Sequence, residues 1–145
     1  MKTTALAAGL LGAIAFGAAA YGIDSAMDAT RTLMSPIDRD HELRAIESRT
    51  RTALAACRGA TEHVRPICRL RARAEDRVAR AELDARYFGT VQAEESAREV
   101  RARARFQVAR AECLDGAASE RARCLSAARA DEAKALAHAM VASTI

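Results

Sequence analysis

The sequence predicts an all-α fold, with two tandem antiparallel helical hairpins after an N-terminal signal or anchor helix. We expect long helices that pack as in a coiled coil or a four-helix bundle. Two observations predict this class. Ala, Arg and Glu, which are strong helix formers, dominate a chain of 145 residues with only two prolines and seven glycines. In addition, a pair of cysteines occurs twice at the same spacing, which indicates a repeated unit.

The apolar content predicts a thin core. Hydrophobic residues make up 50% of the chain, but most of them are alanine, and aromatic residues make up only 3%. Burial of apolar surface contributes about 25 cal/mol per Å², and alanine has little surface to bury. We therefore expect neither a deep core nor a large buried pocket.

Residues 1–20 are predicted to be a signal peptide. Lys2 supplies a positive charge, residues 5–20 form an apolar stretch, and Ala18-Ala19-Ala20 offers small residues for cleavage before Tyr21. This segment predicts export, so that the rest of the chain lies in the periplasm.

The alternative is an inner-membrane anchor over residues 5–23. This apolar run of 19 residues is of borderline length for spanning a bilayer. Its glycines would let two such helices pack closely; they are Gly9, Gly12 and Gly17. The helical part would lie in the periplasm in this case too, and residues 21–35 are expected to link it to the apolar segment.

The first helix is expected to begin at Ser35-Pro36-Ile37-Asp38. Ser35 can accept a hydrogen bond from a free backbone N–H, and Pro36 at the first helical position loses no hydrogen bond. Asp38 complements the positive end of the helix dipole.

The cysteine spacing predicts an internal duplication. Cys113 and Cys124 lie 56 residues after Cys57 and Cys68, respectively. The same shift places Arg65 on Arg121 and superposes several alanines. We interpret residues 36–88 and 89–142 as two copies of a helix–turn–helix unit.

Each unit shows apolar stripes with steps of three and four residues, as in a helix face. In the first unit the stripes are Leu43, Ile46, Thr50, Ala53 and Cys57, then Ile67, Leu70, Ala74, Val78, Ala81 and Ala85. In the second they are Ala93, Ala97, Val100, Ala104, Val108 and Ala111, with a further stripe of Ala102, Phe106, Ala109 and Cys113.

Breaks between the helices are predicted at Gly59, at Gly89 and at Asp115-Gly116, with Thr90 and Ser119 as caps of the helices that follow. The last helix is expected to run to about Met140. Pro66 obscures the start of the second helix, because proline deep inside a helix loses a hydrogen bond.

The helix surfaces carry acid-then-arginine pairs four residues apart, each of which stabilises a helix by a few tenths of a kcal/mol. These pairs are Asp40/Arg44, Glu47/Arg51, Asp76/Arg80, Glu94/Arg98 and Glu99/Arg103.

The four cysteines are expected to form structural disulfides. An antiparallel hairpin brings Cys57 close to Cys68, and Cys113 close to Cys124, and an oxidising compartment favours their oxidation. Four cysteines allow three connectivities, so this pairing is a hypothesis. The alternative is a zinc or copper site on Cys57, His63 and Cys68, but the second unit has Ser119 in place of His63.

The sequence contains no catalytic or cofactor motif, and we expect no enzyme activity and no cofactor. The arginine-rich stretches 65–80 and 98–110 suggest nucleic-acid binding, but interleaved acids, few aromatic residues and export argue against it. With a formal net charge of +4, an anionic envelope surface is a better target.

The pattern resembles a group of small, mostly uncharacterised, Ala-rich exported proteins of proteobacteria that repeat a Cys…Gly…Cys helical unit. The resemblance covers residues 36–140. It is carried by Cys57-Arg58-Gly59, Arg65 with Cys68, residues 78–83 with Ala85-Arg86-Tyr87, residues 108–113, and Arg123-Cys124. Pro66 and the dominance of arginine over lysine depart from that group. The resemblance implies a periplasmic helical repeat and no known activity.

The function that the sequence favours is therefore a non-enzymatic structural, adaptor or stress-related binding role in the cell envelope. Its partners would be envelope proteins, an anionic envelope surface or, through its helices, a second copy. The alternative is a periplasmic protein that handles metal or redox chemistry with its cysteines.

The disulfide hypothesis predicts the result of peptide mapping under non-reducing conditions. Mass spectrometry of the oxidised chain should find Cys57 linked to Cys68 and Cys113 linked to Cys124. A link between the two units, such as Cys57 to Cys113, would contradict the hairpin interpretation.

Overall fold

The computed structural model describes residues 34–141, which form four α-helices. These are α1 (Pro36–Ala56), α2 (Arg65–Phe88), α3 (Val91–Asp115) and α4 (Ala118–Val141), with a short 3₁₀ helix η2 (Cys57–Gly59) after α1. The all-α class and the antiparallel helical hairpins are confirmed. The predicted signal peptide (1–20), the alternative anchor (5–23) and all but the end of the linker (21–35) lie outside the described residues.

The predicted helix ends are confirmed at two places. The Ser35 hydroxyl oxygen accepts a hydrogen bond from the Asp38 N–H at 3.1 Å, with Pro36 as the first residue of α1. Between α2 and α3, Gly89 has a φ of 61°, a left-handed conformation that glycine adopts without steric cost. Thr90 then caps α3 by accepting a hydrogen bond from the Ala93 N–H at 3.2 Å.

Two other helix ends differ from the expectation. Ser119 does not cap the last helix, because α4 begins one residue earlier, at Ala118, and includes Ser119 in its first turn. Pro66 is the second residue of α2, which begins at Arg65. The first four N–H groups of a helix have no partner inside it, so the proline costs α2 no hydrogen bond.

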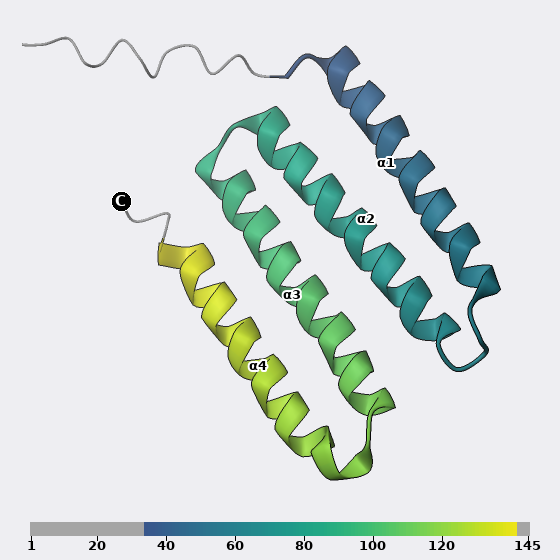
Figure 1. The fold of residues 1–145 in the computed structure, drawn as a ribbon. Coiled ribbons are helices and arrows are strands. Elements are labelled where there is room, and N and C mark those ends of the chain that lie inside the picture. The colour runs from purple at the N-terminus through teal and green to yellow at the C-terminus, as the bar shows by residue number, and fades with distance from the viewer. Residues whose placement is uncertain (1–33, 142–145) are drawn as a thin grey trace, which may run out of the picture. The chain divides into compact units, whose positions relative to one another are not determined.

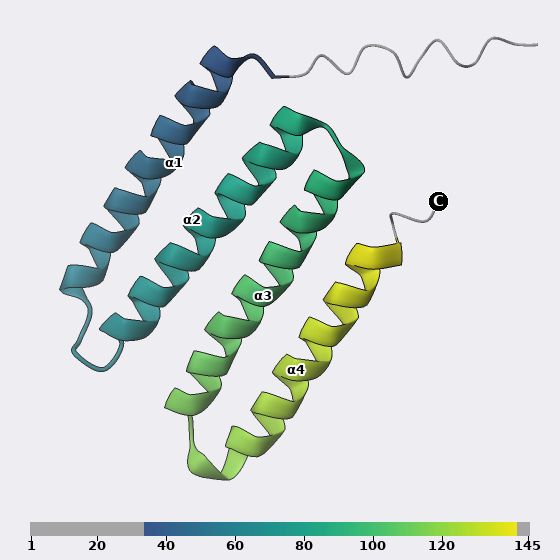
Figure 2. The same ribbon diagram turned by 180° about the vertical axis from the view of Figure 1, so that it is seen from behind.

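The helices pack in series. α1 contacts α2, α2 contacts α3, and α3 contacts α4, whereas no contact joins α1 to α3 or α4, or α2 to α4, within residues 34–141. Figure 1 and the reverse view in Figure 2 both show the four helices side by side in chain order. The antiparallel bundle is therefore open, and each inner helix has two neighbours and two free sides.

The buried side chains follow the predicted repeat. Among the described residues, one set of four consists of Ile46, Cys57, Ala72 and Leu83, and a second set, 56 residues later, consists of Ala102, Cys113, Ala128 and Ala139. The other four are Ala74, Ala85, Ala97 and Ala104, on α2 and α3. Each hairpin thus has its own small core, and a third row of alanines joins the two hairpins.

The apolar stripe predicted for α2 is only part of the buried surface of this helix. Ala74 and Ala85 belong to that stripe, but Ala72 and Leu83 are buried as well, and Leu83 is 0% exposed. The reason is that α2 is an inner helix, which packs against α1 on one side and against α3 on the other. The two stripes expected for the other inner helix, α3, are both buried at Ala97, Ala102, Ala104 and Cys113.

Polar contacts support the α1–α2 packing. Arg39 donates a hydrogen bond to Asp84 at 2.8 Å, and its guanidinium lies 5.0 Å from the centre of the Tyr87 ring. The hydrogen bond to Asp84 raises the pKa of Arg39, so this side chain stays charged. Glu47, which was expected to pair with Arg51, reaches Arg80 on α2 at 3.7 Å instead.

The two outer edges of the array are more polar than the seam in its middle. Val78 on α2 and Val108 on α3 line the groove between these helices. The residues 56 positions away are Lys134 on α4 and Thr52 on α1. Polar residues at these positions are the kind of cap that repeat proteins carry at their ends.

The burial of Leu83 predicts the effect of its truncation. Leu83→Ala should lower the free energy of unfolding by about 3 kcal/mol, because it opens a cavity in the first hairpin. Leu114, which is 45% exposed, provides the control, and Leu114→Ala should change stability by less than about 0.5 kcal/mol. Chemical denaturation followed by circular dichroism measures both, and equal losses would contradict this picture of the core.

Candidate binding faces

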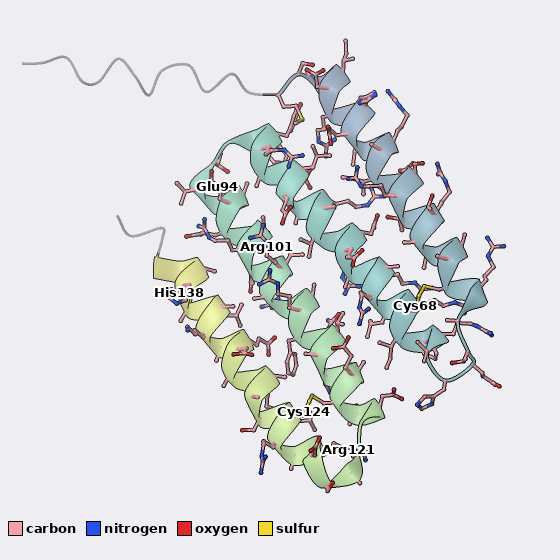
Figure 3. All side chains as sticks on the ribbon, viewed as in Figure 1. Cys68, Glu94, Arg101, Arg121, Cys124 and His138 are labelled. Carbon is pink, nitrogen blue, oxygen red and sulfur yellow. A yellow bond between two sulfur atoms is a disulfide. The ribbon has the colours of Figure 1, made fainter. Side chains whose placement is uncertain are left out.

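The two disulfide loops have the same local structure. Cys57 is bonded to Cys68 and Cys113 to Cys124, each pair with a sequence separation of 11 and with Cα–Cα distances of 5.7 and 5.5 Å. Figure 3 shows both bonds, labelled at Cys68 and Cys124, at the same end of the helices. The pairing within each unit that the spacing suggests is the one the structure has.

An arginine closes each loop in the same way. Arg65 donates a hydrogen bond to the Ala60 carbonyl at 3.0 Å, and Arg121 donates one to the Gly116 carbonyl at 3.5 Å. Both the donors and the acceptors are 56 residues apart. Arg65 and Arg121, which the 56-residue shift superposes, therefore have the same structural role in the two loops.

The alternative metal site on Cys57, His63 and Cys68 is not assembled. The two sulfur atoms are bonded to each other, whereas a cysteine binds a metal ion as a thiolate. His63 instead lies 2.6 Å from Asp115, measured from Nε2 to Oδ1, which links the first loop to the end of α3. Over residues 34–141, no group of three His, Cys, Asp or Glu side chains is placed to hold a metal ion.

The two hairpins carry equivalent grooves. The α1–α2 groove is lined by Ile46, Arg49, Thr50, Ala53, Ala72, Glu75, Asp76 and Ala79. The α3–α4 groove is lined by Ala102, Arg105, Phe106, Ala109, Ala128, Asp131, Glu132 and Ala135. Every residue of the second set lies 56 positions after its counterpart in the first, so each groove combines a small apolar floor with one arginine and two adjacent acids.

A third groove runs between α2 and α3 and has a volume of about 480 Å³. Val78, Val108 and alanines form its floor, and an ion pair between α2 and α3 lies at each end, Arg71–Glu112 and Glu82–Arg101. Arg101 is labelled in Figure 3. Exposed ion pairs of this kind each contribute less than about 1 kcal/mol, so their main effect is to frame the groove.

All three grooves open on one face of the array, which we call the grooved face. Glu75 and Ala79 line both the α1–α2 and the α2–α3 groove, and Arg105 and Ala109 line both the α2–α3 and the α3–α4 groove. Since neighbouring grooves share residues, they form one continuous surface across the four helices.

The opposite face is rich in arginine. Residues two positions apart lie about 200° apart around a helix, so Arg77 and Gln107 lie opposite Glu75 and Arg105. The Arg77 guanidinium donates a hydrogen bond to the Gln107 side chain at 2.7 Å, which places α2 and α3 residues together on this face. Exposed arginines one turn away, or at the equivalent position of the repeat, share it; we call Arg51, Arg73, Arg77, Arg103, Arg110 and Arg129 the arginine face.

Several of these arginines are not neutralised by a nearby acid. Arg103 pairs with Glu99, and Asp84, which shares a side of α2 with Arg77, pairs with Arg39. Arg73, Arg110 and Arg129 have no ion-pair partner in the described part of the chain. This leaves guanidinium groups that can bind carboxylate or phosphate in a bidentate manner.

Of the five expected acid–arginine pairs, three are present: Asp76–Arg80, Glu94–Arg98 and Glu99–Arg103. Each stabilises the single helix on which it lies. Asp76 also accepts a hydrogen bond from the Thr50 hydroxyl at 2.9 Å, which fixes it against α1 at the side of the first groove.

Comparisons with protein-family models, with curated proteins and with solved structures find no match to this chain. No residue role is therefore transferred from another protein, and the candidate sites rest on the geometry alone. Within residues 34–141, no helix is both long enough and apolar enough to cross a membrane. The two disulfides are consistent with a location outside the cytoplasm.

The grooves were not predicted from the sequence, although a signal for them exists. The 56-residue shift also superposes Arg49 on Arg105 and Glu75-Asp76 on Asp131-Glu132. Charged residues are so frequent in this chain that those matches carry little weight until the packing shows that they line equivalent grooves.

The difference between the two hairpin cores predicts different responses to disulfide loss. The second core is built of alanines, whereas the first contains Ile46 and Leu83. A disulfide that closes a loop of this length contributes roughly 2–3 kcal/mol. We expect Cys113→Ala/Cys124→Ala to remove hydrogen-exchange protection from α4 while α1 and α2 keep theirs.

The matched variant for this prediction is Cys57→Ala/Cys68→Ala, in which Ile46 and Leu83 still hold α1 against α2. Protection of α1 should fall less in this variant than protection of α4 falls in the other. Equal losses in both variants would contradict the assignment of separate cores.

Proposed function

We propose that this chain is an exported, non-enzymatic helical protein with a structural, adaptor or stress-related binding role in the cell envelope. We further propose that its arginine face contacts an anionic envelope surface. The observation that carries the proposal is the set of exposed arginines on one face, of which only Arg103 has an ion-pair partner among residues 34–141.

The compartment is supported by two independent features. The N-terminal segment has the charge, apolar stretch and small residues of an export signal. The two disulfides would persist in the oxidising periplasm, whereas the cytoplasm keeps such cysteines reduced. Together they favour the periplasm over the interior of the cell.

The anionic target is supported by the type and position of the charges. Basic residues that face an anionic lipid surface each contribute about 1 kcal/mol, and arginine is suited to phosphate oxygens. Arg73 and Arg110 lie at the same level of the antiparallel α2–α3 pair, four and three residues from the hydrogen-bonded Arg77 and Gln107, respectively. Two guanidinium groups side by side on neighbouring helices can bind the same anionic group.

This proposal predicts vesicle binding that depends on the arginine face. The oxidised chain should co-sediment with vesicles that contain phosphatidylglycerol more than with neutral phosphatidylcholine vesicles, and less so at high salt. Replacing Arg73, Arg77 and Arg110 with Gln should weaken binding to the anionic vesicles by roughly 100-fold, at about 1 kcal/mol for each arginine.

The control removes the same charge elsewhere. Arg58, Arg86 and Arg123 are exposed and lie outside the arginine face, and their replacement with Gln should leave most of the binding intact. If the two triple variants lost the same amount of vesicle binding, the binding would depend on net charge alone, which would contradict the proposed face. Free thiols or bound metal in protein purified from the periplasm would favour the alternative role in metal or redox handling.

A further inference from the structure

We propose that the grooved face is the interface of a homodimer, in which two copies of the chain pack face to face about a two-fold axis parallel to the helices. The inference concerns the other side of the molecule from the arginine face, and it does not depend on where the protein acts.

The grooved face offers apolar surface that nothing in the described part of the chain covers. Its floor consists of Val78, Val108, Phe106 and the alanines of the three grooves. A single layer of helices leaves this surface open, because the helices contact only their neighbours in sequence.

The face is large enough for a stable interface. Helices of 24 residues, such as α2 and α4, are about 36 Å long at 1.5 Å per residue. Four of them, spaced by about 9 Å, are roughly 30 Å wide. The face therefore offers on the order of 1,000 Å² per copy, against about 800 Å² per partner in a standard protein–protein interface.

The charges on this face identify a second copy as the occupant. Arg49 on α1, Glu75 on α2, Arg105 on α3 and Asp131 on α4 form a row of alternating sign across the grooves. All four side chains are exposed, and none has an ion-pair partner in the described range. When this row of four charges is read in the reverse order, from α4 to α1, each position carries the opposite sign. A second copy in reversed helix order is therefore complementary to the first.

A two-fold axis parallel to the helices performs that reversal. It places α1 over α4 of the second copy, so that Arg49 faces Asp131, and α2 over α3, so that Glu75 faces Arg105. A two-fold axis across the helices would instead place each helix over itself and each charge over its own kind, which is unfavourable. Of these two isologous arrangements, the charge row thus favours the one with its axis parallel to the helices.

Association at the edges of the array is disfavoured by its composition. An edge-to-edge contact of α4 with α1 of another copy would place Lys134 and Thr52 where the α2–α3 seam has Val78 and Val108. The face is therefore the better surface for self-association, and the resulting dimer closes the open layer into two layers of helices.

The test uses analytical ultracentrifugation of the oxidised full chain and two charge-reversal variants. The wild-type chain should be dimeric. Glu75→Arg places arginine opposite arginine twice in the dimer, and Arg105→Glu places acid opposite acid twice. Each variant should weaken dimerisation at least about tenfold, with an unchanged helical circular dichroism spectrum.

Mixing the two variants provides the decisive measurement. In the heterodimer, the arginine introduced by Glu75→Arg in one copy faces the glutamate introduced by Arg105→Glu in the other. The native Arg105 of the first copy faces the native Glu75 of the second, so two variants that are mainly monomeric alone should dimerise together. A chain with both reversals should dimerise by itself for the same reason. A structural defect caused by either substitution would not be repaired by mixing.

The matched controls are Glu62→Arg and Arg44→Glu, which reverse exposed charges outside the grooves and should leave dimerisation unchanged. A wild-type chain that stays monomeric at every concentration overturns the proposal. Chemical cross-links between the groove residues and the N-terminal residues of the same chain would also overturn it, because the N-terminal segment would then occupy the grooved face. If neither Glu75→Arg nor Arg105→Glu weakened the dimer, the interface would lie elsewhere and the proposal would be overturned. The same holds if the mixture of the two variants failed to associate.

Discussion

The predominance of alanine among the buried side chains is the constraint on which the rest of this structure depends. Alanine side chains let helices approach closely, but each one removes little apolar surface from water. Of the side chains buried among residues 34–140, only Ile46 and Leu83 are large aliphatic ones, and both lie in the first hairpin. A fold of this kind needs stabilisation from sources other than its core.

The disulfides and the polar contacts supply that stabilisation. Each bond closes a short loop between antiparallel helices, which limits the freedom of the unfolded chain in the region where the hairpin begins. The arginine that binds a loop carbonyl in each unit orders the same turn. Ion pairs along and between the helices add small increments. We expect the second hairpin, whose buried residues are mostly alanine, to depend most on its disulfide.

Serial packing determines what the protein can present to partners. A closed bundle would bury one side of every helix, whereas an open row leaves two faces, and here the two faces differ in chemistry. One has apolar grooves with charges of alternating sign, and the other has a surplus of arginine. If two copies join through their grooved faces, the two arginine faces point outward in opposite directions, an arrangement suited to bridging two anionic surfaces.

The sequence by itself determined the helices, their caps at Ser35 and Thr90, the turn at Gly89 and the repeat, because each depends on the chemistry of neighbouring residues or on a strict spacing of cysteines. It did not determine which helices would touch. The second stripe of α2, with Leu83, and the grooves around Glu75 and Arg105 depend on the neighbours that a helix has in space. In a chain where alanine and arginine recur at almost every turn, many faces look alike, and only tertiary packing decided which of them are buried, which form grooves and which carry unpaired charge.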